Sequence, residues 1–166
     1  MKQINFWLTK ITGYFVSILM LLIVITVLWQ VFSRYVLMSP SAGSDEISRF
    51  LLIWLGLLGS TYCYQQNSHL SLDILARKLS LNAQVNLARL VHFLIFTFSL
   101  AVLIIGGINL VATTLQPVQL SAVLEIKMAY VYSVMPLTGA IYCFTAIEKL
   151  FFVKSAHFVS PQVAGE

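Results

Sequence analysis

The chain has 166 residues, of which 59% are hydrophobic and 10% are charged, and its formal net charge is +4. A typical soluble domain has about a quarter of its residues charged, and small domains bury only about two-thirds of the surface that their chains expose. A water-soluble fold is therefore excluded, and lipid is the expected solvent. The ten Lys and Arg residues stand at the ends of apolar runs, which indicates membrane orientation rather than nucleic-acid binding.

Four apolar runs predict four transmembrane helices, because a hydrocarbon core about 30 Å thick requires roughly 20 helical residues. We predict an all-α integral membrane protein with a single domain, 1–166. Its spans are expected at about residues 11–36, 46–65, 87–115 and 128–152. The first run is far longer than the roughly 7–15 apolar residues of a signal peptide, so we interpret it as a retained anchor.

Positive charge predicts the orientation of these spans. Of the ten Lys and Arg residues, seven would lie on the side of the two termini and the middle loop, and three on the other side. The positive-inside rule then places both termini in the cytoplasm of a bacterial inner membrane.

A polar cluster follows the first external loop. Ser44 is the expected N-cap of the second helix, and Asp45 and Glu46 follow in its first turn, where negative charge complements the helix dipole. Asp45 and Arg49 are four residues apart, so they can pair on one helix face. One interpretation is that the cluster only caps and orients the helix. The other is a contact with a partner protein, because Arg34 and Arg49 would be costly in lipid.

The segment between the second and third spans predicts an amphipathic helix in the cytoplasmic interface, at about residues 71–84. It has two apolar ridges, which leaves open whether lipid or protein covers it. His69 and Asp73 are four residues apart at its start. A hydrogen-bonded turn is the favoured interpretation of this pair, ahead of a role in proton handling.

Glycine and proline residues mark the third and fourth spans. Gly106 and Gly107 are adjacent, with Asn109 nearby, and predict a close approach of two helices. We expect Pro117 to end the third helix and Pro136 to kink the fourth.

The sequence lacks the motifs of several functional classes. It has no GK[ST] phosphate loop, no HExxH and no CxxC, and every charge sits near the end of an apolar run. Transporters that act alone usually keep an ionisable residue deep inside a span. We therefore expect no enzyme activity, cofactor, metal site or substrate-binding residue in this chain, and we interpret it as an accessory or scaffold subunit.

Three sequence elements stand out between residues 29 and 75. Residues 30–36 are QVFSRYV, residues 44–56 are SDEISRFLLIWLG, and His69 precedes Asp73-Ile74-Leu75. Together they resemble the small membrane subunit of tripartite ATP-independent periplasmic (TRAP) transporters, the DctQ-like family, including its sialic-acid type. The resemblance marks a set of candidate partner-interface or motif residues: Arg34, Ser44, Asp45, Glu46, Arg49, Trp54, His69 and Asp73.

The match extends into the fourth span and has local departures. Tyr130, Pro136 and Gly139 follow the family's looser spacing there. The departures are Gly43, where the family often has an aromatic residue, Gln65-Gln66, where a basic residue is common, and Lys127, where a proline is frequent.

The resemblance implies a subunit that pairs with a much larger membrane subunit, the DctM-like component, which carries the substrate and sodium sites. A periplasmic substrate-binding protein would deliver an organic acid, such as a C4-dicarboxylate or a sialic acid. The small subunit would enlarge the static scaffold, with its other surfaces against lipid.

Two other functional classes are weighed against this interpretation. A four-span membrane redox or enzyme subunit would need paired cysteines in external loops, whereas Cys63 and Cys143 lie inside apolar runs. A small self-assembling exporter would need an acidic residue inside a span.

Overall fold

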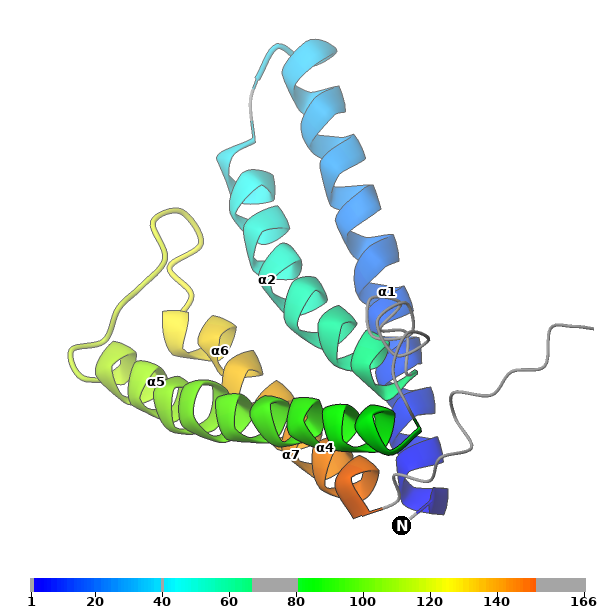
Figure 1. Ribbon diagram of the computed structural model, residues 1–166. Helices are drawn as coiled ribbons and strands as arrows, with labels where there is room; N and C mark the ends of the chain where they lie inside the picture. Colours follow the sequence, from blue (N-terminus) through cyan, green and yellow to red (C-terminus); the bar gives the residue numbers. More distant parts are fainter. Residues whose placement is uncertain (1, 40, 67–80, 152–166) are drawn as a thin grey trace, which may run out of the picture.

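The computed structural model describes residues 2–39, 41–66 and 81–151, which are predominantly helical (Figure 1). Within those residues, four helical segments are long and apolar enough to cross a membrane: Asn5–Tyr35, Ala42–Gln65, Val85–Leu115 and Met128–Leu150. The predicted all-α fold with four membrane spans is therefore confirmed.

The first span is a single long helix, α1, Lys2–Tyr35. Its 34 residues extend about 50 Å at 1.5 Å per residue, which is longer than the hydrocarbon core. The helix starts nine residues before the predicted start at residue 11, because residues 2–10 contain no Gly or Pro that would stop it. The predicted start at residue 11 marks where the apolar run begins, and the helix begins before it.

The second span is α2, Ala42–Gln65, and its N-cap differs from the prediction. Ser41, not Ser44, is the N-cap, with an extended backbone at φ −86° and ψ 99°. Its hydroxyl oxygen accepts a hydrogen bond from the backbone N–H of Ser44 at 3.4 Å. Ser44 already lies inside the helix and donates its own hydroxyl to the carbonyl oxygen of Ser41 at 2.9 Å. An N-cap needs a non-helical backbone, which Ser44 lacks.

The third span combines three helical segments without a break: α4, Leu81–Phe98, the π-helix η1, Ser99–Gly106, and α5, Gly107–Leu115. Residues 81–84, which the sequence assigns to the interfacial helix, belong to α4 and lead into the span. The rest of that predicted helix lies outside the described residues. As predicted, the helix ends just before Pro117.

The fourth span is interrupted near its start. The short helix α6, Met128–Tyr132, is followed by Ser133 and by α7, Val134–Phe151. The nitrogen of Pro136 has no proton, so it cannot donate to the carbonyl oxygen of Tyr132 four residues earlier. This missing bond accounts for the interruption at Ser133, three residues before the position at which the sequence predicts a kink.

Helices α2 and α7 are at the centre of the arrangement. Helix α1 packs on α2, α2 packs on α7, and α7 packs on α4 and η1. Figure 1 shows the start of α1 and the ends of α2 and α7 at one end of the molecule, from which the two halves diverge. Leu19, Leu58 and Val134 form a buried core where α1, α2 and α7 meet.

Glycines permit the close contact between α7 and the third span. A Cβ atom on Gly139 would lie 2.8 Å from the Cβ atom of Leu103, which belongs to η1. A Cβ atom on Gly107 would lie 3.0 Å from the Cβ atom of Met135 on α7. At Gly106 the nearest atom would be 3.8 Å away, so only the second glycine of the predicted pair makes the approach.

Candidate functional site

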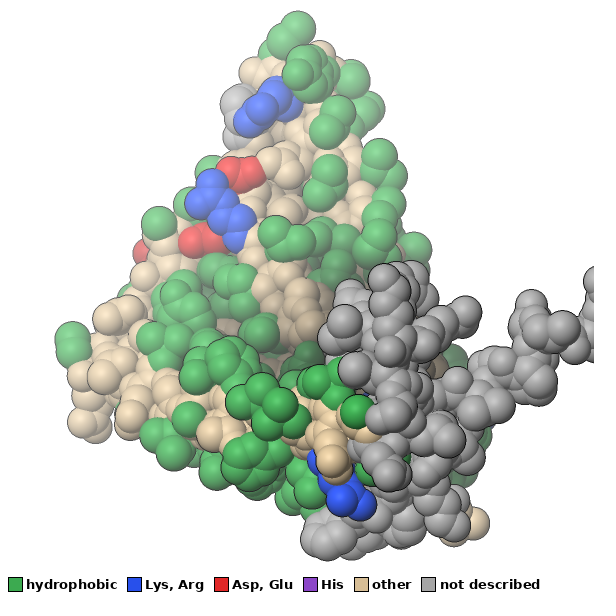
Figure 2. Space-filling model, in the orientation of Figure 1, with side chains coloured by type: hydrophobic (Ala, Val, Ile, Leu, Met, Phe, Trp, Pro, Cys, Tyr) green, Lys and Arg blue, Asp and Glu red, His purple; other side chains and the backbone are tan. Residues whose placement is uncertain are grey.

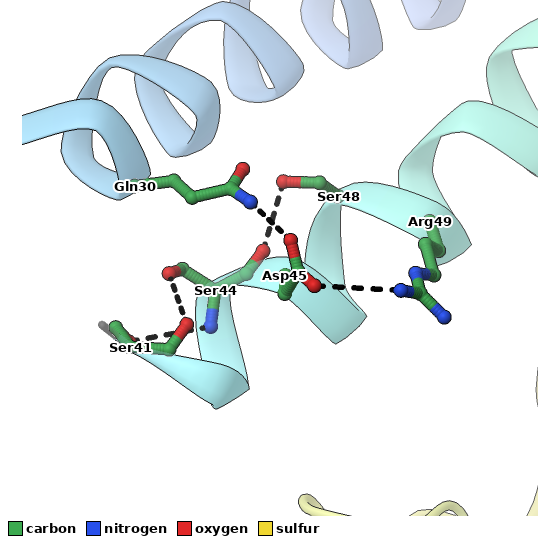
Figure 3. Close-up of polar contacts among 6 residues, drawn as sticks. All are labelled: Gln30, Ser41, Ser44, Asp45, Ser48 and Arg49. Carbon is green, nitrogen blue, oxygen red and sulfur yellow. Dashed lines mark hydrogen bonds and ion pairs between the residues drawn. The ribbon is translucent and has the colours of Figure 1, made fainter. Parts of the chain in front are cut away.

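The first polar cluster joins α1 to the start of α2 (Figure 3). The carboxylate of Asp45 accepts a hydrogen bond from the side-chain amide of Gln30 on α1. Its other oxygen pairs with Nη2 of Arg49 at 3.4 Å, which confirms the predicted pairing on one helix face. The Arg49 side chain is 77% exposed, so this pair contributes little stability and leaves most of the guanidinium accessible to a partner.

Glu46 has a separate role, which is to anchor the loop between the third and fourth spans. Its carboxylate accepts hydrogen bonds from three consecutive backbone N–H groups, those of Ala122 at 3.1 Å, Val123 at 3.1 Å and Leu124 at 2.9 Å. Three donors directed at one carboxylate form an anion-binding turn. The two neighbouring acids therefore bind different elements: Asp45 binds α1, and Glu46 binds this loop.

Trp54 connects α2 to the fourth span. Its indole N–H donates to the carbonyl oxygen of Val131 at 3.1 Å, and its ring packs against the buried core of Leu19, Leu58 and Val134. The candidate residues Asp45, Glu46 and Trp54 thus lie along one helix and contact three different elements.

The remaining candidates are more dispersed. Arg34 is exposed in the last turn of α1, where positive charge complements the helix dipole. Ser44 is buried in the first turn of α2. His69 and Asp73 lie outside the described residues. Figure 2 shows charged side chains toward the two ends of the visible face, with hydrophobic side chains over much of the area between them.

A second polar cluster, which the sequence did not predict, lies at the opposite end of α2. The hydroxyl of the fully buried Tyr64 is 3.1 Å from Nδ1 of His92 on α4. The Nζ atom of Lys149 lies 4.2 Å from the centre of the Tyr64 ring and donates to the carbonyl oxygen of Tyr64. The Tyr142 ring lies 5.3 Å away, centre to centre. These contacts join α2, α4 and α7.

Three buried hydroxyls within the spans bond within their own helices. Thr61 donates to Leu57, Thr138 to Val134 and Thr145 to Ile141, at 2.8–2.9 Å. Among the described residues, buried side-chain polar atoms without a hydrogen-bond partner belong to Asn5, Gln65, Ser121 and Glu148. The same residues contain no group of three potential metal ligands.

These features define a multi-pass helical membrane protein. Its polar side chains form hydrogen bonds between helices and loops, mostly near the ends of the spans. The sequence pattern of the family "Tripartite ATP-independent periplasmic transporters, DctQ component" matches residues 23–153. The chain therefore belongs to the DctQ family and is a small permease subunit of a TRAP transporter.

Two relatives agree with this assignment. The chain is 27% identical over 129 residues to the sialic acid TRAP transporter small permease protein SiaQ of Vibrio cholerae, an alignment that covers 74% of this chain and 69% of SiaQ. It is 39% identical over 64 residues to a protein of Haemophilus influenzae named as a TRAP transporter small permease, covering 39% of each chain.

Proposed function

We propose that this chain is the static scaffold subunit of a sodium-coupled, binding-protein-dependent TRAP transporter in a bacterial inner membrane. It pairs with a large DctM-like membrane subunit, which carries the solute and sodium sites, and it catalyses no reaction and holds no cofactor. A periplasmic substrate-binding protein delivers the solute. Both termini face the cytoplasm, as the charge distribution predicts.

One observation carries the proposal: a wide apolar face of α1 has no partner within the described chain. Helix α1 packs mainly on α2. Large apolar or aromatic side chains recur on its exposed face every three or four residues and are between 45% and 69% exposed. They are Tyr14, Ile18, Leu21, Ile25, Leu28, Phe32 and Tyr35. This stripe runs along most of the span and offers a second helix a continuous packing surface.

One relative supports a proposal for the solute class. SiaQ is named as a component of a sialic acid transporter, and its alignment covers most of both chains. We therefore propose an organic acid as the solute, either a sialic acid or a C4-dicarboxylate. We expect two exposed side chains to contact a partner protein: Arg34 at the end of α1 and Arg49 near the start of α2.

Co-purification tests the scaffold role. The chain is expressed with the large TRAP membrane subunit of the same organism and isolated in mild detergent. We expect one complex, and we expect Leu21→Trp to weaken it, because a packed helix interface cannot accept the larger ring whereas lipid can. Ile105→Trp is the matched control, since Ile105 is a similarly exposed residue of the third span. A chain that purifies alone, or a complex insensitive to Leu21→Trp, would contradict the proposal.

A further inference from the structure

A cavity of about 560 Å³ lies between the first half of α1, the end of α2 and Glu148 near the end of α7. It is at the opposite end of α2 from the cluster of Asp45 and Glu46. Asn5, Lys10, Gln65 and Glu148 are among the residues that line it. The predicted spans end here, so the cavity is at the level of lipid headgroups.

Several polar groups in this cavity have no hydrogen-bond partner among the residues that the structure describes. Gln65 is only 7% exposed, and neither its amide nitrogen nor its amide oxygen has a partner among the described residues. Glu148 is 8% exposed, and its Oε2 atom has no partner in the same part of the chain. Within residues 2–39, 41–66 and 81–151, the amide oxygen of Asn5 is also unpartnered. Buried polar groups are nearly always hydrogen-bonded, and a buried carboxylate oxygen without a donor is costly. Most of these unpartnered atoms are hydrogen-bond acceptors. A ligand that satisfies them therefore needs several N–H donors.

The neighbouring lysines do not donate hydrogen bonds to these acceptors. Lys149 follows Glu148 in the chain and interacts with it electrostatically. Its Nζ atom nevertheless donates to the carbonyl oxygen of Tyr64 and lies over the Tyr64 ring, so the Oε2 atom of Glu148 still lacks a donor among the described residues. Lys10 is exposed on the α1 side of the cavity, with its Nζ atom 5.5 Å from the centre of the Phe6 ring. The cavity thus has a buried acceptor group and, separately, an exposed cation. A ligand that complements both has an ammonium group at one position and an anionic group at another.

We propose that this cavity binds the headgroup of a zwitterionic, amine-bearing phospholipid. The ammonium group donates to the Glu148 carboxylate and the Gln65 amide oxygen, and the phosphate lies toward Lys10. Exposed side chains of α1 that lie further into the span than Lys10, such as Ile11 and Tyr14, are placed to contact the acyl chains. Free phosphoethanolamine has the same headgroup chemistry, but only the lipid gains from that apolar surface.

Native mass spectrometry of the full chain in detergent tests this site. Delipidated protein is titrated with dioleoylphosphatidylethanolamine, with dioleoylphosphatidylglycerol and with phosphoethanolamine. We expect preferential binding of phosphatidylethanolamine. Glu148→Gln should weaken that binding by about tenfold or more, the effect of losing one hydrogen bond to a charged group. Glu125→Gln is the matched control, because it removes the same charge from an exposed loop position.

Lys10→Gln gives an independent test, because the side chain is exposed and its replacement should leave the fold intact. It should also weaken phosphatidylethanolamine binding, with an unchanged circular dichroism melting curve. Equal binding of phosphatidylglycerol, or wild-type affinity in both variants, would overturn the proposal. Phosphoethanolamine binding as tightly as the lipid would overturn it in favour of a soluble amine. Loss of the lipid when the large subunit binds would instead assign the cavity to a partner side chain.

Discussion

Replacing Gly139 with alanine tests how the third and fourth spans are held together. The new Cβ atom would lie 2.8 Å from the Leu103 Cβ atom, 2.9 Å from Ile104 Cγ1 and 3.2 Å from the Ile104 backbone nitrogen. None of these atoms is the end of a flexible side chain. Ordinary contact begins at 3.4 Å, so the helices must separate by about 0.6 Å (3.4 minus 2.8). Overpacking of this kind typically costs about 1–3 kcal/mol.

Gly56→Ala is the matched control for this change. Gly56 also lies inside a spanning helix, but a Cβ atom there would meet nothing within 4 Å. Both variants gain the same helix propensity, about 1 kcal/mol in favour of alanine, so the difference between them isolates the steric term.

The assay is thermal unfolding of the full chain in detergent, followed by tryptophan fluorescence. At about 2–4 °C per kcal/mol for a chain of this size, Gly139→Ala should melt several degrees below Gly56→Ala. Equal melting temperatures, or a more stable Gly139→Ala, would refute the close contact described between α7 and η1.

Three further substitutions test the polar contacts of α2. Glu46→Gln should speed amide hydrogen exchange at residues 122–124, because an amide offers one acceptor oxygen where the carboxylate offers two. The control Glu125→Gln should leave this exchange unchanged. Unchanged exchange in Glu46→Gln would contradict the anchoring role. Trp54→Phe should lower the unfolding free energy by about 0.5–1.5 kcal/mol through loss of its bond to Val131, and an unchanged melting curve would argue against that bond. Arg49→Ala should weaken co-purification with the large subunit at unaltered chain stability, whereas unchanged assembly would favour the interpretation that the cluster only caps the helix.

The spans were predictable because continuous apolarity over such lengths has few other structural solutions. The ends of the helices were harder to predict, because hydropathy indicates which residues contact lipid and not where the helical backbone begins. Helix α1 thus begins at Lys2, well before its apolar run. The N-cap was misplaced for a related reason: Ser41 and Ser44 have the same side chain, and only the backbone angles distinguish the capping residue.

Whether a contact of a candidate residue could be predicted depends on how far apart its two residues are in the sequence. The pair of Asp45 and Arg49 was predicted because four residues are one helical turn. The partners of Glu46 lie 76–78 residues away, and Lys149 lies 85 residues from Tyr64, so no local pattern could indicate these contacts. Glu148 follows 20 uncharged residues that begin after Lys127, so the sequence shows an acid at the end of an apolar run. Its burial depends on how α1, α2 and α7 converge, which the sequence does not display.

Solute uptake into proteoliposomes tests the scaffold role most directly. Vesicles contain the large TRAP subunit alone, this chain alone, or both, with the periplasmic binding protein outside and labelled sialic acid or succinate supplied under an inward sodium gradient. We predict sodium-dependent uptake of one of these acids only when both membrane subunits are present, and none with this chain alone. Uptake by this chain alone, or full uptake by the large subunit without it, would contradict the account.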